Sequence, residues 1–399
     1  MTTYEFHFFN RSGQIRRIQD FVCIDDKAAL REASIARGSH DIEVWQGSQL
    51  VARLRQRERA SWSTLKLKDL TACQIEQWHQ LHARETALRS PFTTYEFCRA
   101  VDKVRGTVFV AILHDGDEVQ AIFPFERYSR LIPGIAQKPG GHLSDCFGII
   151  GGMRHPLNKR ELLKATGLSV FSFDHLPLPE NGLPVWRGAV TQGMHIGLPS
   201  FSDYVERLRR TNKKFVKEVE RLSNQLVLQH GPMQFQWQSA SPTLELDRLI
   251  DRKREQYQRT RRPDALKPAW TRALLSDLLA TQDKNCEEIL STLYCGDTWV
   301  ASNLALRTGE LLHIWFPVFN QDLRRFGPGH ILFFNLLESA AAHGVRVVDF
   351  GGGVTPYKRK YAGNEYPLFK GALRRFDLLS VAHQAAQCLS WRVRPFLSN

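Results

Sequence analysis

The stretch Leu311–Gly363 decides the fold, and it reads LLHIWFPVFN (311–320), QDLRRFGPGH (321–330), ILFFNLLESAAAHG (331–344), VRVVDFGGG (345–353) and VTPYKRKYAG (354–363). The first segment is apolar, aromatic and of strand length, and the second is a turn rich in Gly and Arg. The third has apolar residues at helical spacing and ends at Gly344, while 345–350 is a short β-branched run typical of a buried strand. The order strand, glycine turn, helix, strand predicts a βαβ unit.

The glycine turn has the pattern R-x-x-G-x-G, formed by Arg324, Gly327 and Gly329. Glycine lets the backbone approach a ligand closely. The first N–H groups of the following helix are unpaired and carry a partial positive charge. Together these features predict a cradle for a pyrophosphate. The turn is not a Walker loop, because no G-K-[ST] follows, and its glycines are not in the order of the dinucleotide-binding fingerprint.

This turn resembles the acyl-CoA pyrophosphate loop of the GNAT acetyltransferase superfamily. The string DFGGGVTPYKRKYAG (349–363) is similar to the end of the CelD/BcsL-type acetyltransferases of cellulose and exopolysaccharide synthesis, which are relatives of the Fem peptidyltransferases. The resemblance extends over residues 62–385 and is closest over 290–375. It implies a GNAT-type N- or O-acetyltransferase that uses acetyl-CoA or another acyl-CoA and no metal.

The composition of the chain indicates which partners, cofactors and cellular location to expect. The chain has 399 residues and a net charge of +13, which favours an anionic partner such as a nucleotide cofactor, a phosphorylated lipid or sugar, RNA or a membrane surface. It has no apolar run long enough to cross a membrane and no evident signal peptide. The seven cysteines are scattered and none forms C-x-x-C, so we expect reduced thiols, no metal site and a cytoplasmic location.

The chain is expected to form three units. Residues 1–57 predict a small ββαββ module. Residues 62–200 predict two helices, a hairpin, a glycine-rich loop, a helix and a strand. Residues 201–385 open with a basic connector helix, 203–228, and then repeat that order. We therefore predict an α+β fold with tandem GNAT-like domains, whose mixed central sheets are flanked by helices. The basic helix is either a solvated connector or the rim of an anion-binding site.

Only the second domain has R-x-x-G-x-G in the expected place, so it is predicted to hold the donor and the first domain to have a degenerate donor site. The resemblance implies that the two central strands splay there and that a backbone N–H polarises the thioester carbonyl. Pro317 fits a splayed strand, because proline cannot donate a ladder hydrogen bond, although the strand could also end at Phe316.

Four residues are candidates for catalysis. His313 is the predicted general base, since an ordinary histidine pKa lies near ~6.5; it could instead be a core histidine. Asp349 is predicted at the end of its strand, either as a second catalytic group or as a cap for the glycine-rich turn. Tyr357 and Tyr361 share one face of a predicted helix, 354–362. The resemblance implies that one of them acts as the acid, with Tyr357 favoured and Tyr361 as the second candidate; either could instead be a core residue.

The ligand-binding candidates fall into two sets. The residues predicted to contact acyl-CoA are Arg324, Arg325, Phe326, Gly327, Gly329, His330, Ile331, Phe316 and Val318. Those predicted to hold the acceptor are His142, Asp145 and Lys358; the first two could instead belong to a turn, and Lys358 could be a solvated lysine.

The leading hypothesis is an acyl-CoA-dependent acyltransferase acting on an anionic or sugar-containing precursor of a polysaccharide or the cell envelope. A second is a tRNA-dependent aminoacyltransferase of the Fem type, which would bring RNA as a partner through the basic helix and Arg261-Arg262-Pro263. A third is a basic, non-catalytic binding protein with a degenerate cleft. DNA is not an expected partner under any of them.

Overall fold

The computed structural model describes residues 1–10, 13–36, 41–54, 60–86, 89–116, 118–129, 131–151, 157–177 and 185–384, apart from the side chains of 185–190. The chain divides into two compact units. The smaller consists of Met1–Ser61 with His114–Glu118, and the larger of Trp62–Leu113 with Val119–Asn399.

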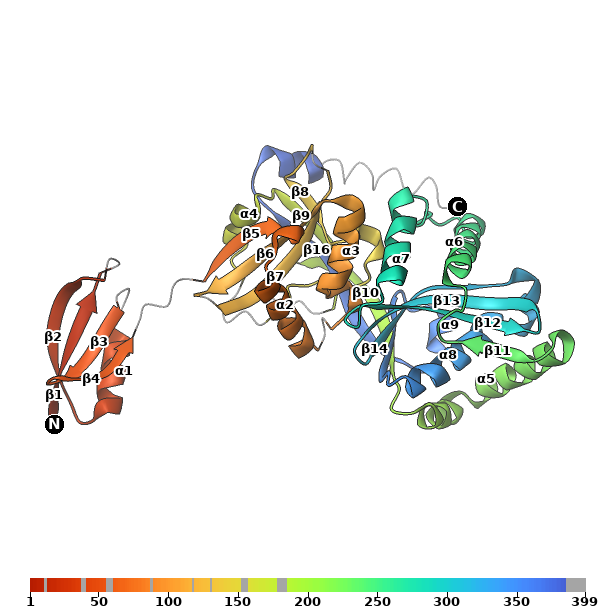
Figure 1. Ribbon diagram of the computed structural model, residues 1–399, viewed down its shortest axis with the longest axis horizontal. Helices are drawn as coiled ribbons and strands as arrows, with labels where there is room; N and C mark the ends of the chain where they lie inside the picture. Colours follow the sequence, from red (N-terminus) through yellow and green to blue (C-terminus); the bar gives the residue numbers. More distant parts are fainter. Residues whose placement is uncertain are drawn as a thin grey trace. The chain divides into compact units, whose positions relative to one another are not determined.

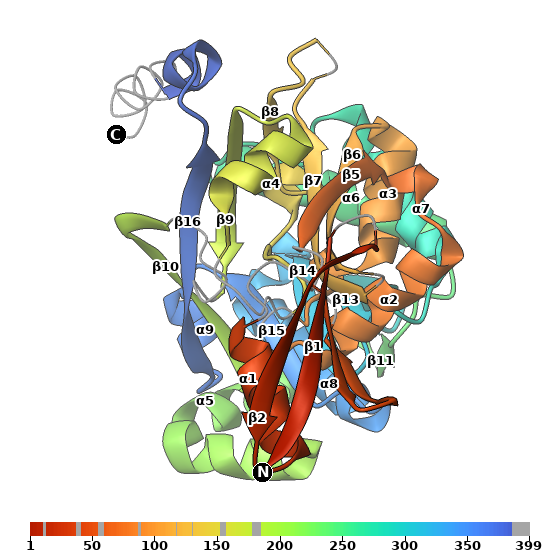
Figure 2. The ribbon, with the colours of Figure 1, turned by 90° about the vertical axis from the view of Figure 1, so that its left-hand side faces the viewer.

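The smaller unit contains the predicted ββαββ module, which is confirmed. Its elements are β1 (Thr2–Phe9), β2 (Ile15–Cys23), α1 (Asp26–Ala36), β3 (Asp41–Gln46) and β4 (Gln49–Leu54). The sheet order is β2-β1-β3-β4; Figure 1 labels all four strands, and Figure 2 labels β1 and β2 with α1. Alternation along β1 places Tyr4, Phe6 and Phe8 on one face, where they are buried with Ile42 and Val44 in the core that also holds alanines of α1.

The larger unit has two halves with the same order of elements. The first half contains β5 (Ser61–Lys66), α2 (Ala72–Arg84), α3 (Tyr95–Arg105), β6 (Val108–Asp115), β7 (Glu118–Arg127), β8 (Ile135–Gln137), α4 (Lys159–Thr166), β9 (Val170–Leu176) and β10 (Val185–Gly197). The second contains α5 (Phe201–His230), β11 (Met233–Gln236), α6 (Pro242–Arg259), α7 (Ala269–Thr281), β12 (Glu287–Cys295), β13 (Thr298–Thr308), β14 (Leu311–Phe319), α8 (Pro328–Ala342), β15 (Val347–Gly352), α9 (Pro356–Arg359) and β16 (Asn364–Arg374).

The two halves share one mixed sheet because they exchange their last strands. The order is β11-β12-β13-β14-β15-β10-β16-β9-β8-β7-β6-β5 (Figure 1). Strand β10 of the first half pairs antiparallel with β15 of the second, and β16 of the second pairs antiparallel with β9 of the first. The predicted fold class, α+β with tandem GNAT-like domains, is confirmed.

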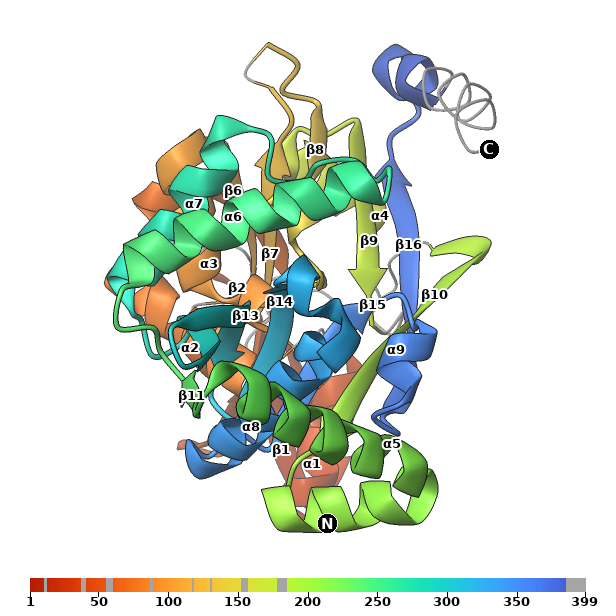
Figure 3. The ribbon, with the colours of Figure 1, turned by 90° about the vertical axis from the view of Figure 1, so that its right-hand side faces the viewer.

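Helices cover both faces of the second half of the sheet (Figures 1 and 3). One face packs against α5 and α8 through a core that includes Phe215, Ile331 and Phe350. The other packs against α6 and α7 through a core that also contains Trp78 and Phe97 of the first half. The halves therefore meet on the α6–α7 face.

Two boundaries near the site differ from the prediction. The predicted helix 354–362 is a single turn, α9, because the chain turns left-handed at Ala362, with φ 50°. The strand predicted at 345–350 is β15, Val347–Gly352, since its pairing with β10 continues as far as Gly193 opposite Gly352. Asp349 therefore lies inside the strand and not at its end.

The basic helix α5 is a connector whose charges are partly paired. It breaks at Asn212 (φ −144°, ψ 56°), and Arg209 and Arg221 form ion pairs with Glu220 and Glu218 of the same helix. None of the described helices is long and apolar enough to span a membrane. Six cysteines are free thiols, and Cys388 lies outside the described residues.

Candidate active site

The central strands β14 and β15 form a fork. They pair in parallel at three positions only, the last being His313 opposite Asp349, while β14 continues to Phe319 and β15 to Gly352. The register of β14 against β13 shifts at Trp315, and such a bulge bends a strand. Pro317 lies in the part of β14 that no longer pairs with β15, although it still pairs with β13. The splay that the resemblance implied is therefore present, and it starts directly after His313.

The predicted pyrophosphate turn leads from the end of β14 into α8. It contains the 3₁₀ helix η5 (Gln321–Phe326), a left-handed Gly327 with φ 62°, and Pro328 as the first residue of α8. Three amides of the turn already donate to its own carbonyls: Gly327 to Arg324 at 3.1 Å, and His330 and Ile331 to Gly327 at 2.9 and 3.3 Å. Pro328 has no N–H, so within the described chain only Gly329 keeps a free amide. The turn therefore offers fewer backbone amides to a pyrophosphate than the sequence predicts.

The side chains of this turn also divide into available and occupied groups. Arg324 is exposed and has no partner among the described residues. Arg325 instead donates to Gln229 Oε1 at 2.8 Å and lies 4.7 Å over the ring of Phe326. The other predicted donor-site residues with large side chains are buried in the two cores, and these are Phe316, Val318, Phe326 and Ile331.

Three aromatic side chains pack at the first turn of α8. The Tyr357 hydroxyl donates to the carbonyl of Gly329 at 3.1 Å, and Tyr361 donates to Tyr357 at 3.3 Å. His330 stacks on Tyr357, with ring centres 4.5 Å apart, and its Nδ1 is 2.7 Å from the Tyr361 hydroxyl. Burial lowers the pKa of His330 to about 4. Tyr357 is 39% exposed as a residue, but desolvation of its hydroxyl within this cluster raises its pKa to about 12, so both side chains are neutral near pH 7. Tyr361 is fully buried in the core beside α8.

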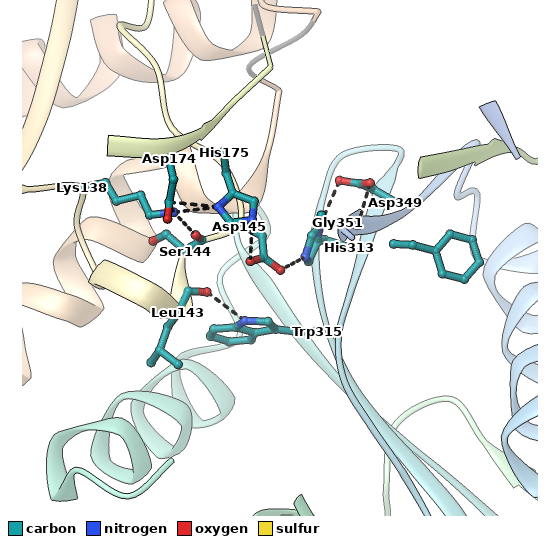
Figure 4. A network of polar contacts seen from close by, with 12 residues as sticks. Lys138, Leu143, Ser144, Asp145, Asp174, His175, His313, Trp315, Asp349 and Gly351 are labelled. Carbon is teal, nitrogen blue, oxygen red and sulfur yellow. Dashed lines mark hydrogen bonds and ion pairs between the residues drawn. The ribbon is translucent and has the colours of Figure 1, made fainter. Parts of the chain in front are cut away.

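At the fork, His313 lies between two carboxylates (Figure 4). Its Nδ1 is 3.1 Å from Oδ2 of Asp349, and its Nε2 is 3.1 Å from Oδ2 of Asp145. Burial of the ring would lower the pKa of His313, but the hydrogen bonds to Asp145 and Asp349 outweigh it and raise the pKa to about 9. The histidine is therefore an imidazolium at neutral pH with both N–H groups in use. This geometry does not suit the predicted role of general base, since no nitrogen is free to accept a proton.

Both carboxylates beside His313 are held by further groups. Burial would raise their pKa values, but the hydrogen bonds from His313 outweigh it and lower both. Asp349 Oδ1 accepts from the Tyr366 hydroxyl at 2.8 Å and from the amide of Gly351 at 3.0 Å. Asp145 Oδ1 lies 3.9 Å from Nε2 of His175. Trp315 anchors the loop that carries Asp145, because its Nε1 donates to the Leu143 carbonyl at 3.0 Å.

Behind Asp145, the first half supplies a group of charges that the sequence analysis missed. His175 has a left-handed backbone, with φ 55°, and its Nδ1 lies 3.0 Å from Asp174 Oδ1. Lys138 is buried and forms an ion pair with Asp174. The sequence signal was the string VFSFD (170–174), which echoes VRVVDF (345–350) and places Asp174 near the end of the strand equivalent to β15.

The ammonium group of Lys358 binds backbone carbonyls at the fork, so this residue is not the solvated lysine considered above. Its Nζ donates to the carbonyls of Phe350 and Gly352, at 2.8 Å each. Burial lowers its pKa, although nearby Asp145 and Asp349 oppose that effect. The lysine thus holds the end of β15 beyond the point where its pairing with β14 stops.

A cavity of about 550 Å³ opens beside the fork and is lined by residues of both halves. Its lining residues are Glu85, Thr86, Arg89, Ser90, Asp145, Cys146, Pro177, His195, Glu310, Leu311, Val347, Asp349, Tyr366, Pro367 and Leu368. Phe350 packs in the core of the α8 face, so its neighbour Asp349 points to the other face of the sheet. The cavity and the α8 turn therefore lie on opposite faces of the sheet at the fork.

The predicted acceptor residues separate in the structure. Asp145 lines the cavity, and Lys358 lies at the end of β15. His142 is exposed, its Nε2 is 3.2 Å from the carbonyl of Ala265, and it does not line the cavity. Within the described residues, no group of three or more His, Cys, Asp or Glu side chains could hold a metal ion.

Comparison with known proteins agrees with this geometry. Residues 213–359 match the family model of the Acetyltransferase (GNAT) domain. No curated protein matches the sequence. Among solved structures, FemX is similar with a TM-score of 0.52 and 11% identity, over 77% of this chain and 96% of FemX. A tandem GNAT protein from the clavulanic acid biosynthesis pathway gives a TM-score of 0.45 and 11% identity, over 80% of this chain and all of that one. Residues 213–359 are thus similar to the GNAT acetyltransferase domain, and the fold of the chain is similar to that of FemX.

Proposed function

We propose that this protein transfers an acyl group from acyl-CoA, most simply acetyl-CoA, to an amine or hydroxyl group of an acceptor held in the cavity. The observation that carries the proposal is the fork: β14 and β15 separate after His313, and the glycine turn after β14 starts α8 on one face while the cavity opens on the other. A thioester lying in the fork would then be reached from both faces.

The donor would be held by the groups of the turn that remain available. Arg324 and the Gly329 amide are the candidates for the pyrophosphate. A Cβ on Gly329 would make ordinary contacts, at 3.5 Å with the Tyr357 hydroxyl and 3.8 Å with Phe319, so an alanine fits at this position. In the transfer, the acceptor nucleophile forms a bond to the acyl carbon and the carbon–sulfur bond breaks. The acceptor loses one proton to solvent, and the leaving thiolate gains one proton. Tyr357, which stays protonated to about pH 12, is the proposed proton donor.

Binding of the donor predicts a rise in the thermal unfolding midpoint when acetyl-CoA is added, since a ligand that binds only the native state stabilises it. Gly329→Glu should abolish this rise, because it places a carboxylate where the diphosphate would lie, whereas Gly329→Ala should keep it. Arg324→Ala should reduce the rise, while Arg160→Ala, at an exposed arginine of α4, should not. Differential scanning fluorimetry over a range of acetyl-CoA concentrations makes the measurement. An unchanged rise in Gly329→Glu would refute the donor site.

Loss of the Tyr357 hydroxyl should slow turnover without weakening the donor complex. We expect Tyr357→Phe to lower kcat by about 100-fold, the lower range for a lost general acid, and to leave the Kd for acetyl-CoA unchanged. Tyr128→Phe, at a tyrosine that is 61% exposed, is the matched control. Steady-state rates and titration calorimetry separate the two effects. Equal rates in Tyr357→Phe and the wild type would exclude the tyrosine as the acid.

The proposed acceptor is a sugar-containing or anionic precursor of a polysaccharide or the cell envelope, modified in the cytoplasm. The support is the resemblance of residues 349–363 to the CelD/BcsL-type acetyltransferases. The size of the cavity, about 550 Å³, suits a small acceptor or one end of a larger one.

A second candidate is aminoacyl transfer from tRNA, as in the Fem type. One observation favours it: Lys213, Lys214 and Lys217 are exposed on α5, which packs against α8. This candidate predicts RNA binding that weakens steeply with salt and no response to acetyl-CoA. The acetyl-CoA titration above therefore also decides between the two.

A further inference from the structure

The first half of the large unit lacks the R-x-x-G-x-G turn, yet it contributes a charged group to the fork. Asp145 follows η3 (Gly141–Leu143) of the first half, and its carboxylate binds His313 of β14, 168 residues further along the chain. His313 is 1% exposed, and a Cβ placed on Gly351 would lie 2.9 Å from its Cε1. The ring is therefore pressed against the backbone of β15 where the strands separate.

We propose that Asp145 is a positioning residue for acyl transfer, which fixes the His313 imidazolium at the fork so that the first half completes the reaction centre of the second. This inference rests on the proposed function. The cation would lie beside the thioester carbonyl, where negative charge develops during attack by the acceptor. Asp145 would act through His313 and would not itself take part in the bond changes.

Among the groups that contact the His313 ring, Asp145 is the charged one that the first half supplies. From β15, Asp349 contacts the other nitrogen, and its second oxygen is held by Tyr366 of β16 and the Gly351 amide. From α2–α3, the ring of Phe92 packs edge-on at 4.9 Å. The charged or titratable groups around these contacts are Lys358 of α9, His195 of β10 opposite Asp349, Cys146 beside Asp145, and His175, Asp174 and Lys138 of the first half.

The charge balance at the fork then depends on Asp145. With both carboxylates ionised and His313 protonated, the triad carries one net negative charge, and burial opposes the protonated ring. Without the Asp145 charge, a single carboxylate would oppose that burial. His313 would then lose its proton at a lower pH, and the fork would lose its cation.

The test compares Asp145→Asn with the wild type by a pH–rate profile and by NMR titration of the His313 ring. Asparagine is isosteric and can accept the same N–H, so the fold is retained while the charge is removed. We expect the alkaline limb of kcat, near pH 9 in the wild type, to move down by at least one pH unit, with the Kd for acetyl-CoA unchanged. At pH 8.5 a shift of one pH unit should lower kcat by about threefold, because the protonated fraction of His313 falls by that factor. In Asp145→Glu, which keeps the negative charge, the alkaline limb should lie between those of the wild type and Asp145→Asn.

The matched control is Asp174→Asn, which removes a carboxylate that is 51% exposed and contacts His175 and Lys138 but not His313. Its alkaline limb should stay in place. An active wild type whose limb and ring titration are both unchanged by Asp145→Asn would overturn the inference. Absence of transfer by the wild type, with the ring titration still shifted by Asp145→Asn, would instead refute the proposed function on which it rests.

Discussion

Gly351→Ala should destabilise the protein by about 3 kcal/mol or more, because the site strains the new side chain and disturbs a buried ion pair. Gly351 has φ 66°, and its Cβ would lie 2.9 Å from His313 Cε1 and 3.0 Å from Asp145 Oδ2. Neither atom can retreat easily, since each belongs to the hydrogen-bonded triad with Asp349. Urea unfolding followed by tryptophan fluorescence measures the loss.

Gly353→Ala is the control for the backbone part of this effect. Gly353 has φ 79°, and nothing lies within 4 Å of its Cβ position, so alanine should cost only the ~1 kcal/mol of left-handed strain. The difference between the two variants isolates the contact with His313 and Asp145. If Gly351→Ala and Gly353→Ala have the same unfolding free energy, the ring is not held against β15 as described.

His313→Leu should cost roughly 3–5 kcal/mol, the usual penalty for removing one partner of a buried ion pair. The substitution leaves Asp145 and Asp349 facing each other without the cation that separates them. His142→Leu, at an exposed histidine of the same half as Asp145, should change the unfolding free energy by less than about 0.5 kcal/mol.

The same histidine predicts how stability depends on pH. Its pKa in the folded protein, about 9, lies above the ordinary value near ~6.5, so protonation favours the folded state. The stabilisation is complete below about pH 6.5 and is lost as the pH rises through 9, a fall of roughly 3 kcal/mol for this group. Urea unfolding at a series of pH values should show this fall in the wild type and in His142→Leu, but not in His313→Leu. The same pH dependence in the wild type and in His313→Leu would contradict the buried imidazolium.

The chemistry of the site was only partly accessible from the sequence. His313 and Asp349 were found because each lies on a strand of the βαβ unit. The sequence does not indicate that Asp145 contacts His313. Without that contact, His313 has the ordinary pKa of a free imidazole, and for that reason the sequence predicts a general base. Tyr357 and Tyr361 were placed on one helix face, but the helix is a single turn and Tyr361 lies beyond it. Their hydroxyls still meet, because helix-like turns continue past α9: the Tyr361 amide donates to the Lys358 carbonyl and the Ala362 amide to the Arg359 carbonyl.

The sequence by itself determined the βαβ unit, the glycine turn and the repeated order of elements in the two halves. These features follow from local signals, namely side-chain period, turn residues and capping, which act over a few residues. Only the tertiary structure decided that β10 and β16 exchange partners and that Asp145 meets His313. Both depend on which distant segments bury their apolar faces together, and the contact between Asp145 and His313 joins residues 168 positions apart. A cation at the fork is therefore a property of the packed halves, while the turn that would bind the donor is a property of the chain.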